Sequence, residues 1–161
     1  MFGPRRGRRL RGPFRPILRD GLTTLGFEVG EPVILPDDAR LIAAAVLAAV
    51  ADGARVVLTT GGTGVGPRDV TVEATRPLLA YEIPGIAEAV RAAGLAKTPL
   101  SSLSRGVAGV IGSEDRRAFV FNAPGSRGGA RDALGVLGPI LTHIVDQLDG
   151  ADHDMGRPPS R

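Results

Sequence analysis

The 161-residue sequence contains no cysteine and no tryptophan, and aromatic residues make up only 4% of it. The absence of cysteine excludes disulfide bonds, thiolate zinc sites, iron–sulfur clusters and cysteine nucleophiles. The scarcity of aromatic side chains argues against a stacking platform for single-stranded nucleic acid. No apolar run approaches the roughly 20 residues of a membrane-spanning helix, so we predict no membrane contact. The lack of cysteine fits a reducing compartment, and we expect a cytoplasmic protein.

Basic residues are distributed unevenly along the chain. The sequence has 20 basic and 17 acidic residues, a formal net charge of +3. Seven of the basic residues are arginines within 1–19, where no acidic residue occurs, so 13 basic and 17 acidic residues leave 20–161 at −4. A fold that reads a nucleic-acid groove usually carries its positive charge on the body, so the composition argues against a nucleic-acid partner. An arginine-rich arm that contacts a polyanion is the alternative.

The length and the hydrophobic content of 43% fit one globular domain. We predict a basic, disordered arm at 1–12, a folded domain at 13–150 and a flexible tail at 151–161. Helical spacing of apolar residues covers 14–25, 38–51, 71–79, 84–96 and 127–148, and short apolar segments typical of strands cover 27–35, 55–60 and 117–122. This alternation predicts a three-layer α/β fold with a mostly parallel sheet between helices.

Ligands of such sheets bind beyond the carboxyl ends of the strands, which directs attention to three loops. The first follows Thr60 and contains four glycines and Thr63 within 61–66. Glycines let the backbone approach a ligand and turn N–H groups toward an anion. A P-loop would need Gly-Lys-Ser/Thr where this chain has Gly66-Pro67-Arg68, so that motif is absent. We predict an anion site here, with a simple tight turn as the alternative.

Two aspartates stand at the ends of predicted strands or loops. Asp37 follows the 27–35 segment, and Asp69 closes the glycine loop. Each could cap the helix after it. Together, beside a phosphate, they could instead hold Mg²⁺.

The loop after Asn122 also opens a helix, whose free N–H groups would suit a phosphate or the edge of a base. Ser126 as a plain N-cap is the alternative there. Lys97 is the only lysine of the chain, and His143 lies in an apolar helical pattern typical of a core or interface histidine. Two separated histidines without cysteine argue against a transition-metal site.

Several motifs closely resemble the molybdopterin-binding domain family, and more narrowly its MoaB/Mog branch. They are Thr-Thr-Gly-Gly-Thr-Gly at 59–64, Pro-Arg-Asp-Val-Thr at 67–71, Lys-Thr-Pro at 97–99, Leu-Ser-Arg-Gly-Val-Ala-Gly at 103–109 and Asn-Ala-Pro-Gly-Ser at 122–126. The resemblance covers roughly 20–150. It implies a three-layer α/β fold that assembles as a homotrimer or homohexamer. It also implies transfer of AMP from Mg-ATP to the terminal phosphate of molybdopterin, with a molybdenum insertase as the next partner.

On the matching positions, the resemblance implies that Asp37 and Asp69 are catalytic and magnesium-linked. It implies substrate contacts in both glycine loops and in a segment that faces the pterin and its phosphate. The residues are Thr60, Gly61, Gly62, Thr63 and Gly64 in the first loop, Pro124, Gly125, Ser126 and Gly128 in the second, and Lys97, Ser104 and Arg105 in the third segment.

The N-terminal end departs from the family pattern. The family begins with an apolar strand, a Ser-Asp stretch and Asp-x-Ser-Gly-Pro, whereas Gly12-Pro13 here follows an arginine run. That strand would be internal to the sheet, so its loss would remove one wall of the site. The alternative to an active enzyme is therefore a catalytically impaired molybdopterin-binding or scaffold protein of the same fold.

Overall fold

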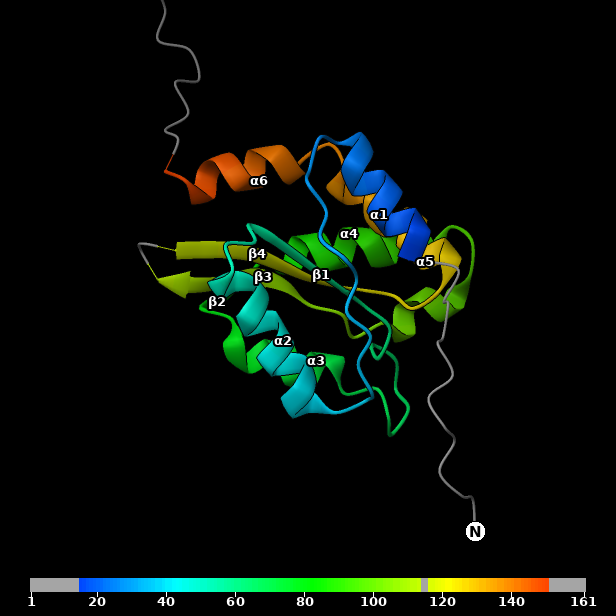
Figure 1. Ribbon diagram of the computed structural model, residues 1–161. Coiled ribbons are helices and arrows are strands. Elements are labelled where there is room, and N and C mark those ends of the chain that lie inside the picture. Colours follow the sequence, from blue (N-terminus) through cyan, green and yellow to red (C-terminus); the bar gives the residue numbers. More distant parts are fainter. Residues whose placement is uncertain (1–14, 114–115, 151–161) are drawn as a thin grey trace, which may run out of the picture.

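The computed structural model describes residues 15–113 and 116–150. The predicted arm at 1–12 and tail at 151–161 lie outside these residues. The helices are α1 (Arg15–Thr24), α2 (Ala39–Ala51), α3 (Thr71–Thr75), α4 (Pro84–Leu95), α5 (Arg127–Leu137) and α6 (Leu141–Leu148), with 3-10 turns η1 (Arg76–Leu78) and η2 (Pro99–Leu103). The strands are β1 (Val56–Thr60), β2 (Tyr81–Glu82), β3 (Ala108–Ser113) and β4 (Arg116–Ala123) (Figure 1).

Capping side chains and prolines set the boundaries of several helices. The Asp38 carboxylate accepts the backbone N–H groups of Arg40 and Leu41 at 2.8 and 3.1 Å, so α2 starts one residue later. Pro84 opens α4, where its missing N–H costs nothing. The helical pattern at 127–148 divides into α5 and α6 around Pro139, which cannot continue the hydrogen bonding of a helix.

The strands form one sheet in the order β1-β4-β3-β2. β1 runs parallel to β4, whereas β4 with β3 and β3 with β2 are antiparallel. The predicted α/β class is confirmed, but the prediction of a mostly parallel sheet is wrong. β3 and β4 are consecutive in the chain and joined by a short hairpin, and such a connection permits only antiparallel pairing.

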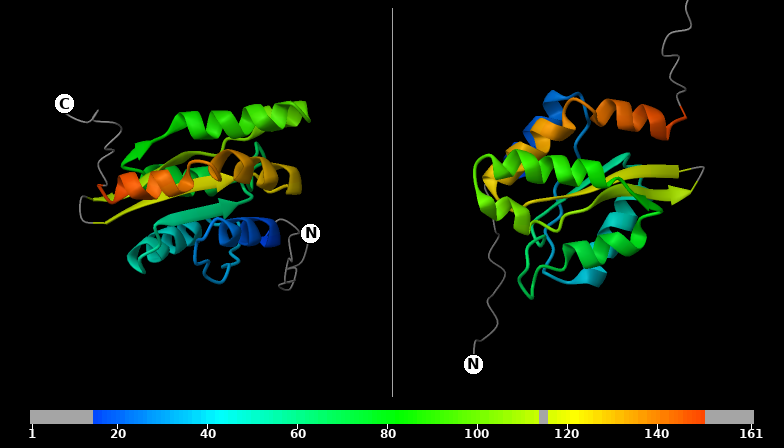
Figure 2. Two further views of the ribbon diagram at one scale, coloured as in Figure 1. Left: turned by 90° about the horizontal axis from the view of Figure 1, so that it is seen from above. Right: turned by 180° about the vertical axis from the view of Figure 1, so that it is seen from behind.

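Helices cover both faces of the sheet, which confirms the three predicted layers. Figure 1 shows α1, α5 and α6 on one side and α2 and α3 on the other, and the view from behind in Figure 2 places α4 with the first group. The side chains of β4 alternate between these layers. Phe119 and Phe121 belong to the core cluster with α4, α5 and α6, and Ala118 and Val120 belong to the cluster with α2.

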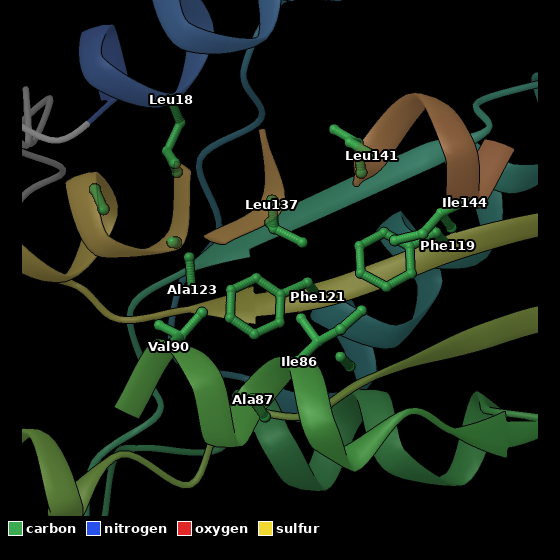
Figure 3. Packing of buried hydrophobic residues seen from close by; sticks show 13 residues of the cluster. Leu18, Ile86, Ala87, Val90, Phe119, Phe121, Ala123, Leu137, Leu141 and Ile144 are labelled. Carbon is green, nitrogen blue, oxygen red and sulfur yellow. The ribbon is translucent and has the colours of Figure 1, made fainter. Parts of the chain in front are cut away.

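The larger core lies on the α4, α5 and α6 side. Figure 3 shows the Phe119 and Phe121 rings between Ile86 and Val90 of α4 and Leu137 above the strand. Both rings are at most 1% exposed. Because these residues are the bulkiest of the buried side chains, they determine the distance between the sheet and this helical layer.

The segment at 27–35 is a connector and not a strand, so that prediction is wrong. It links α1 in one layer to α2 in the other (Figure 1). Within the described ranges it pairs with no strand, and β1 has β4 as its only neighbour. Val33 is consequently 72% exposed and Ile34 50%. An alternating apolar pattern becomes a strand only where a neighbouring backbone supplies hydrogen bonds, and Pro32 lacks a donor to offer one.

In the described part of the chain, no helix has both the length and the apolar character needed to cross a bilayer.

Phe121→Ala should destabilise the protein strongly, because it leaves a large cavity between β4 and α4. We expect a loss of about 3–5 kcal/mol in the free energy of unfolding, measured by urea denaturation. Val33→Ala removes apolar atoms from an exposed connector and should stay within about 0.5 kcal/mol of the parent. Equal losses in the two variants would contradict the placement of the core.

Candidate functional site

Two glycine loops leave the sheet side by side. Val56–Thr60 of β1 and Phe119–Ala123 of β4 are parallel and in register, so Thr60 lies opposite Ala123. Parallel strands end at the same edge of a sheet. The loop 61–69 after β1 and the loop 124–128 after β4 therefore begin next to each other.

Direct contacts join the two loops. The Gly61 N–H donates to the Ala123 carbonyl at 3.2 Å, and the Thr60 hydroxyl donates to the Pro124 carbonyl at 3.2 Å. A Cβ on Gly125 would lie 2.9 Å from the Cα of Gly61, which is closer than real Cβ contacts come. Glycine at 125 is therefore required by the close approach of the two backbones.

The first loop presents unpaired backbone donors. Gly62 has a φ of +65°, a conformation that L side chains rarely adopt. The N–H groups of Gly62, Thr63 and Gly64 donate to no acceptor among the described residues. Thr63 is only 5% exposed. Consecutive unpaired N–H groups of this kind can form an anion-binding concavity.

The second loop has the same character. Its Ser126 hydroxyl caps α5 by accepting the Gly129 N–H at 3.0 Å, which confirms the capping alternative. The N–H groups of Gly125, Arg127 and Gly128 donate to no described acceptor. The positive end of the α5 dipole thus also points to this edge of the sheet.

Asp69 is built into the first loop. Its Oδ2 accepts the Gly66 N–H at 2.9 Å and would lie within 2.9 Å of a Cβ on either Gly64 or Gly66. Asp69 does not cap α3, because the N-cap position is Val70 and has no side-chain cap. Its Oδ1 has no hydrogen-bond donor among the described residues. The carboxylate is therefore fixed in place with one oxygen available to a ligand.

Asp37 is exposed and has no hydrogen bond to the described residues. The neighbouring Asp38 caps α2 instead, so the capping alternative for Asp37 is wrong. Carboxylates with free oxygens are donors that Mg²⁺ prefers. The two aspartates fit that cation in donor chemistry. The described residues contain no cluster of three or more acidic, histidine or cysteine side chains.

Arg105 donates hydrogen bonds to two parts of the first loop. Its Nε donates to the Gly64 carbonyl at 2.7 Å and its Nη2 to the Asp69 carbonyl at 2.6 Å, while the guanidinium forms an ion pair with Glu73. The Arg105 N–H also donates to the Thr63 carbonyl at 2.8 Å. The hydrogen bond from Arg105 holds the pKa of Glu73 below its ordinary value, and the same contact raises the pKa of Arg105.

Lys97 and Ser104 lie in the segment on the α4 side of Arg105. The Lys97 ammonium pairs with Asp132 of α5, a carboxylate that is only 7% exposed. The Ser104 carbonyl accepts a hydrogen bond from Arg91 at 3.4 Å. Both predicted cations of the site, Lys97 and Arg105, therefore already have carboxylate partners. Their direct contact with a substrate phosphate stays a prediction.

Sequence reasoning missed two groups of residues near these loops. The first is a half-open groove of about 270 Å³ beside Arg105, with Arg76, Arg91 and Glu82 in its lining. The second is a buried polar group under the loops, formed by Asn122 and Thr75. A polar residue at the end of an apolar strand was the available signal for Asn122.

Comparison with known proteins identifies the family of the chain. The model of the family described as "Probable molybdopterin binding domain" matches residues 9–143. The chain therefore belongs to the molybdopterin-binding domain family. Its relatives place it in the MoaB/Mog branch of that family.

Among curated relatives, the "Molybdenum cofactor biosynthesis bifunctional protein" of Synechococcus elongatus is 39% identical over 138 residues. That match covers 86% of this chain but 42% of the relative, so the chain spans less than half of that protein. The "Molybdopterin adenylyltransferase" of Pyrococcus furiosus is 34% identical over 131 residues, which cover 81% of this chain and 76% of the relative.

Solved structures show the same fold. A molybdopterin biosynthesis protein from Mycobacterium abscessus superposes with a TM-score of 0.80 at 43% identity, over 87% of each chain. The molybdopterin biosynthesis enzyme MoaB of Thermus thermophilus gives 0.77 at 42% identity, over 87% of this chain and 86% of that one.

The Glu73–Arg105 ion pair should make the stability of the first loop depend on acidic pH. Because folding lowers the pKa of Glu73 from its ordinary value of 4.5, the pair stabilises the folded state above that value. This contribution should disappear as the pH falls through the lowered pKa. We expect the melting temperature of the parent to exceed that of Glu73→Gln at neutral pH and the difference to shrink below pH 4.5.

Glu88→Gln, on the exposed face of α4, is the matched control and should follow the parent at every pH. A Glu73→Gln difference that stays constant from neutral to acidic pH would show that the ion pair does not contribute.

Proposed function

We propose that the chain acts in molybdenum cofactor biosynthesis as a molybdopterin adenylyltransferase. An oxygen of the terminal phosphate of molybdopterin would attack the α-phosphorus of ATP. The new P–O bond forms as the bond to the β-phosphate oxygen breaks, and pyrophosphate leaves. The reaction involves no change of oxidation state, and its products are adenylyl-molybdopterin and pyrophosphate.

The observation that carries the proposal is the pairing of two N–H-lined loops at one edge of the sheet. Joining two phosphorylated substrates requires two anion sites at bonding distance, held in a fixed relation. The loops 61–64 and 124–128 supply unpaired donors and touch through Gly61 and Gly125. A protein that binds only one phosphate group would need only one such loop.

Asp69 and Asp37 suit magnesium better than direct phosphate contact, because a carboxylate beside a phosphate repels it. Magnesium held there would neutralise charge on the reacting phosphates. The hydrogen bond from Gly66 keeps the Asp69 carboxylate at the rim of the first loop. We propose that the fixed Asp69 and the exposed Asp37 are the protein ligands of this cation.

Arg105 binds the first loop and lines the arginine-lined groove, Ser104 precedes it in the chain, and Lys97 pairs with Asp132 of α5. We propose that this segment faces the pterin and its phosphate. Arg105 would act partly by holding the first loop in place, because its guanidinium already binds the carbonyls of Gly64 and Asp69.

The relatives' family also leads us to propose a homotrimer or homohexamer and transfer of the product to a molybdenum insertase. The leucines of η2 offer apolar surface that an interface would bury. Leu100 is 69% exposed and Leu103 is 48% exposed.

Asp69→Asn should abolish most adenylyl transfer while the loop keeps its shape. The Asn side-chain oxygen can still accept the Gly66 N–H, so the substitution removes charge and preserves the hydrogen bond. We expect pyrophosphate release to fall at least about a hundredfold, the scale on which lost electrostatic stabilisation acts. Binding of molybdopterin, followed by fluorescence, should change by less than about threefold, since no pterin contact is removed.

The control is Asp38→Asn, which makes the same change one residue from Asp37 at a helix cap where Asn serves equally well. It should release pyrophosphate at the parental rate. Full activity in Asp69→Asn would remove Asp69 from the proposed chemistry.

A second candidate function is a non-catalytic protein that binds molybdopterin. The unpaired connector 27–35 favours it, because Asp37 follows that connector and is not held by a strand. Molybdopterin binding without pyrophosphate release in the parent protein would select this alternative.

A further inference from the structure

A polar centre lies directly beneath the two loops. Asn122 and Thr75 are both 0% exposed, although they are surrounded by the apolar core. Burying polar groups is costly unless each finds a hydrogen-bond partner. The partners of these two residues therefore show what the centre connects.

The Asn122 carboxamide has three hydrogen-bond partners. Its Nδ2 donates to the hydroxyls of Thr59 at 2.8 Å and Thr75 at 3.0 Å. Its Oδ1 faces the Val107 N–H at 3.5 Å. Because a backbone N–H can only donate, Oδ1 must be the atom on that side, which fixes the orientation of the amide.

Two of these partners, Thr59 and Thr75, flank the first loop in the chain. Thr59 lies opposite Asn122 in the β1–β4 register and precedes the first loop by one residue. Thr75 ends α3, the helix that follows the first loop, and its hydroxyl donates to the Thr71 carbonyl at 2.8 Å. The Thr71 N–H in turn donates to the Gly62 carbonyl at 3.1 Å.

Asn122 itself precedes the second loop by one residue. One buried side chain is thus linked to the start of the first loop, to the helix at its end and, through its own backbone, to the start of the second. The path from Asn122 through Thr75 and Thr71 to Gly62 contains only hydrogen bonds between residues that are at least partly buried.

We propose that Asn122, acting through Thr59 and Thr75, is the positioning residue that sets the placement of the first loop relative to the second. The proposal deepens the adenylyl transfer proposed above and rests on it for its kinetic consequence. Asn122 touches no substrate, since it is fully buried. Loss of the link should leave each anion site intact and disturb the distance between them.

The test compares Thr75→Val with Thr75→Ser. Valine keeps the shape of threonine and removes the hydroxyl, so the link between Asn122 and α3 is broken. Serine keeps the hydroxyl and should restore it. Thr23→Val is the matched control, because the Thr23 hydroxyl also donates to the carbonyl four residues earlier but lies on exposed α1.

The kinetic readout is the division between kcat and KM. Displacing reacting groups by a fraction of an ångström to an ångström lowers the rate up to about a hundredfold. We expect Thr75→Val to lower kcat between about tenfold and a hundredfold, with both KM values within about threefold of the parent. Thr75→Ser and Thr23→Val should keep the parental kcat. A merely structural role would lower the active fraction and leave Thr75→Ser no better than Thr75→Val.

A second readout does not depend on catalysis. Hydrogen exchange of the Thr71 and Gly61 amides reports the bonds to Gly62 and Ala123 that hold the first loop. In Thr75→Val these amides should exchange about tenfold faster while core amides such as Phe119 keep their rates. In Thr75→Ser they should stay protected.

The outcomes separate the two proposals. If the parent protein transfers no AMP but Thr75→Val loosens only the loop amides, the positioning role holds and the proposed function fails. Equal exchange in Thr75→Val and Thr75→Ser, or faster exchange throughout the core, overturns the positioning role whatever the activity.

Discussion

The parallel pairing of β1 with β4 is the contact on which the rest of the structure depends. It is the one parallel pair in the described sheet, and its register places Thr60 opposite Ala123. Both strands therefore release their loops at the same edge, where Gly61 and Gly125 touch. Antiparallel pairing would send the two loops to opposite ends of the sheet, and no site could form between them. Phe119 and Phe121 of β4 pack against the layer of α4, α5 and α6. The Asn122 side chain joins β4 to α3 by its hydrogen bond to Thr75.

The electrostatics of the site depend mainly on the backbone. Two of the cations predicted to bind substrate are already engaged, Arg105 by Glu73 and Lys97 by Asp132. Residues 20–161 carry a net charge of −4, so the body offers no general attraction for phosphate. In the proposed function, unpaired N–H groups and the start of α5 bind the phosphates, and a divalent cation neutralises the remaining charge. That cation would account for the carboxylate of Asp69 next to the unpaired N–H groups of the first loop.

Local signals predicted much of this structure. The 3.6-residue periodicity located α2 to within a residue, and the apolar run located β1 to within a residue. The meeting of the two glycine loops followed from strand–loop–helix order. The connector 27–35 was mispredicted because an alternating pattern carries no information about whether a neighbouring strand exists. The Arg105–Glu73 pair joins residues 32 apart, and the sequence holds no signal that brings them together. Asn122 was predicted as the last residue of a strand, and only the packed structure reveals that its side chain is buried and links the two loops.

The most direct test of the proposed adenylyl transfer is a single-turnover reaction of the protein with molybdopterin, magnesium and ATP that carries a radiolabel on its α-phosphate. The account predicts that the label moves to the pterin in equal amount to the pyrophosphate released, because the two loops hold both substrates within bonding distance. Molybdopterin that binds to the protein and remains unlabelled, with ATP intact, would contradict it.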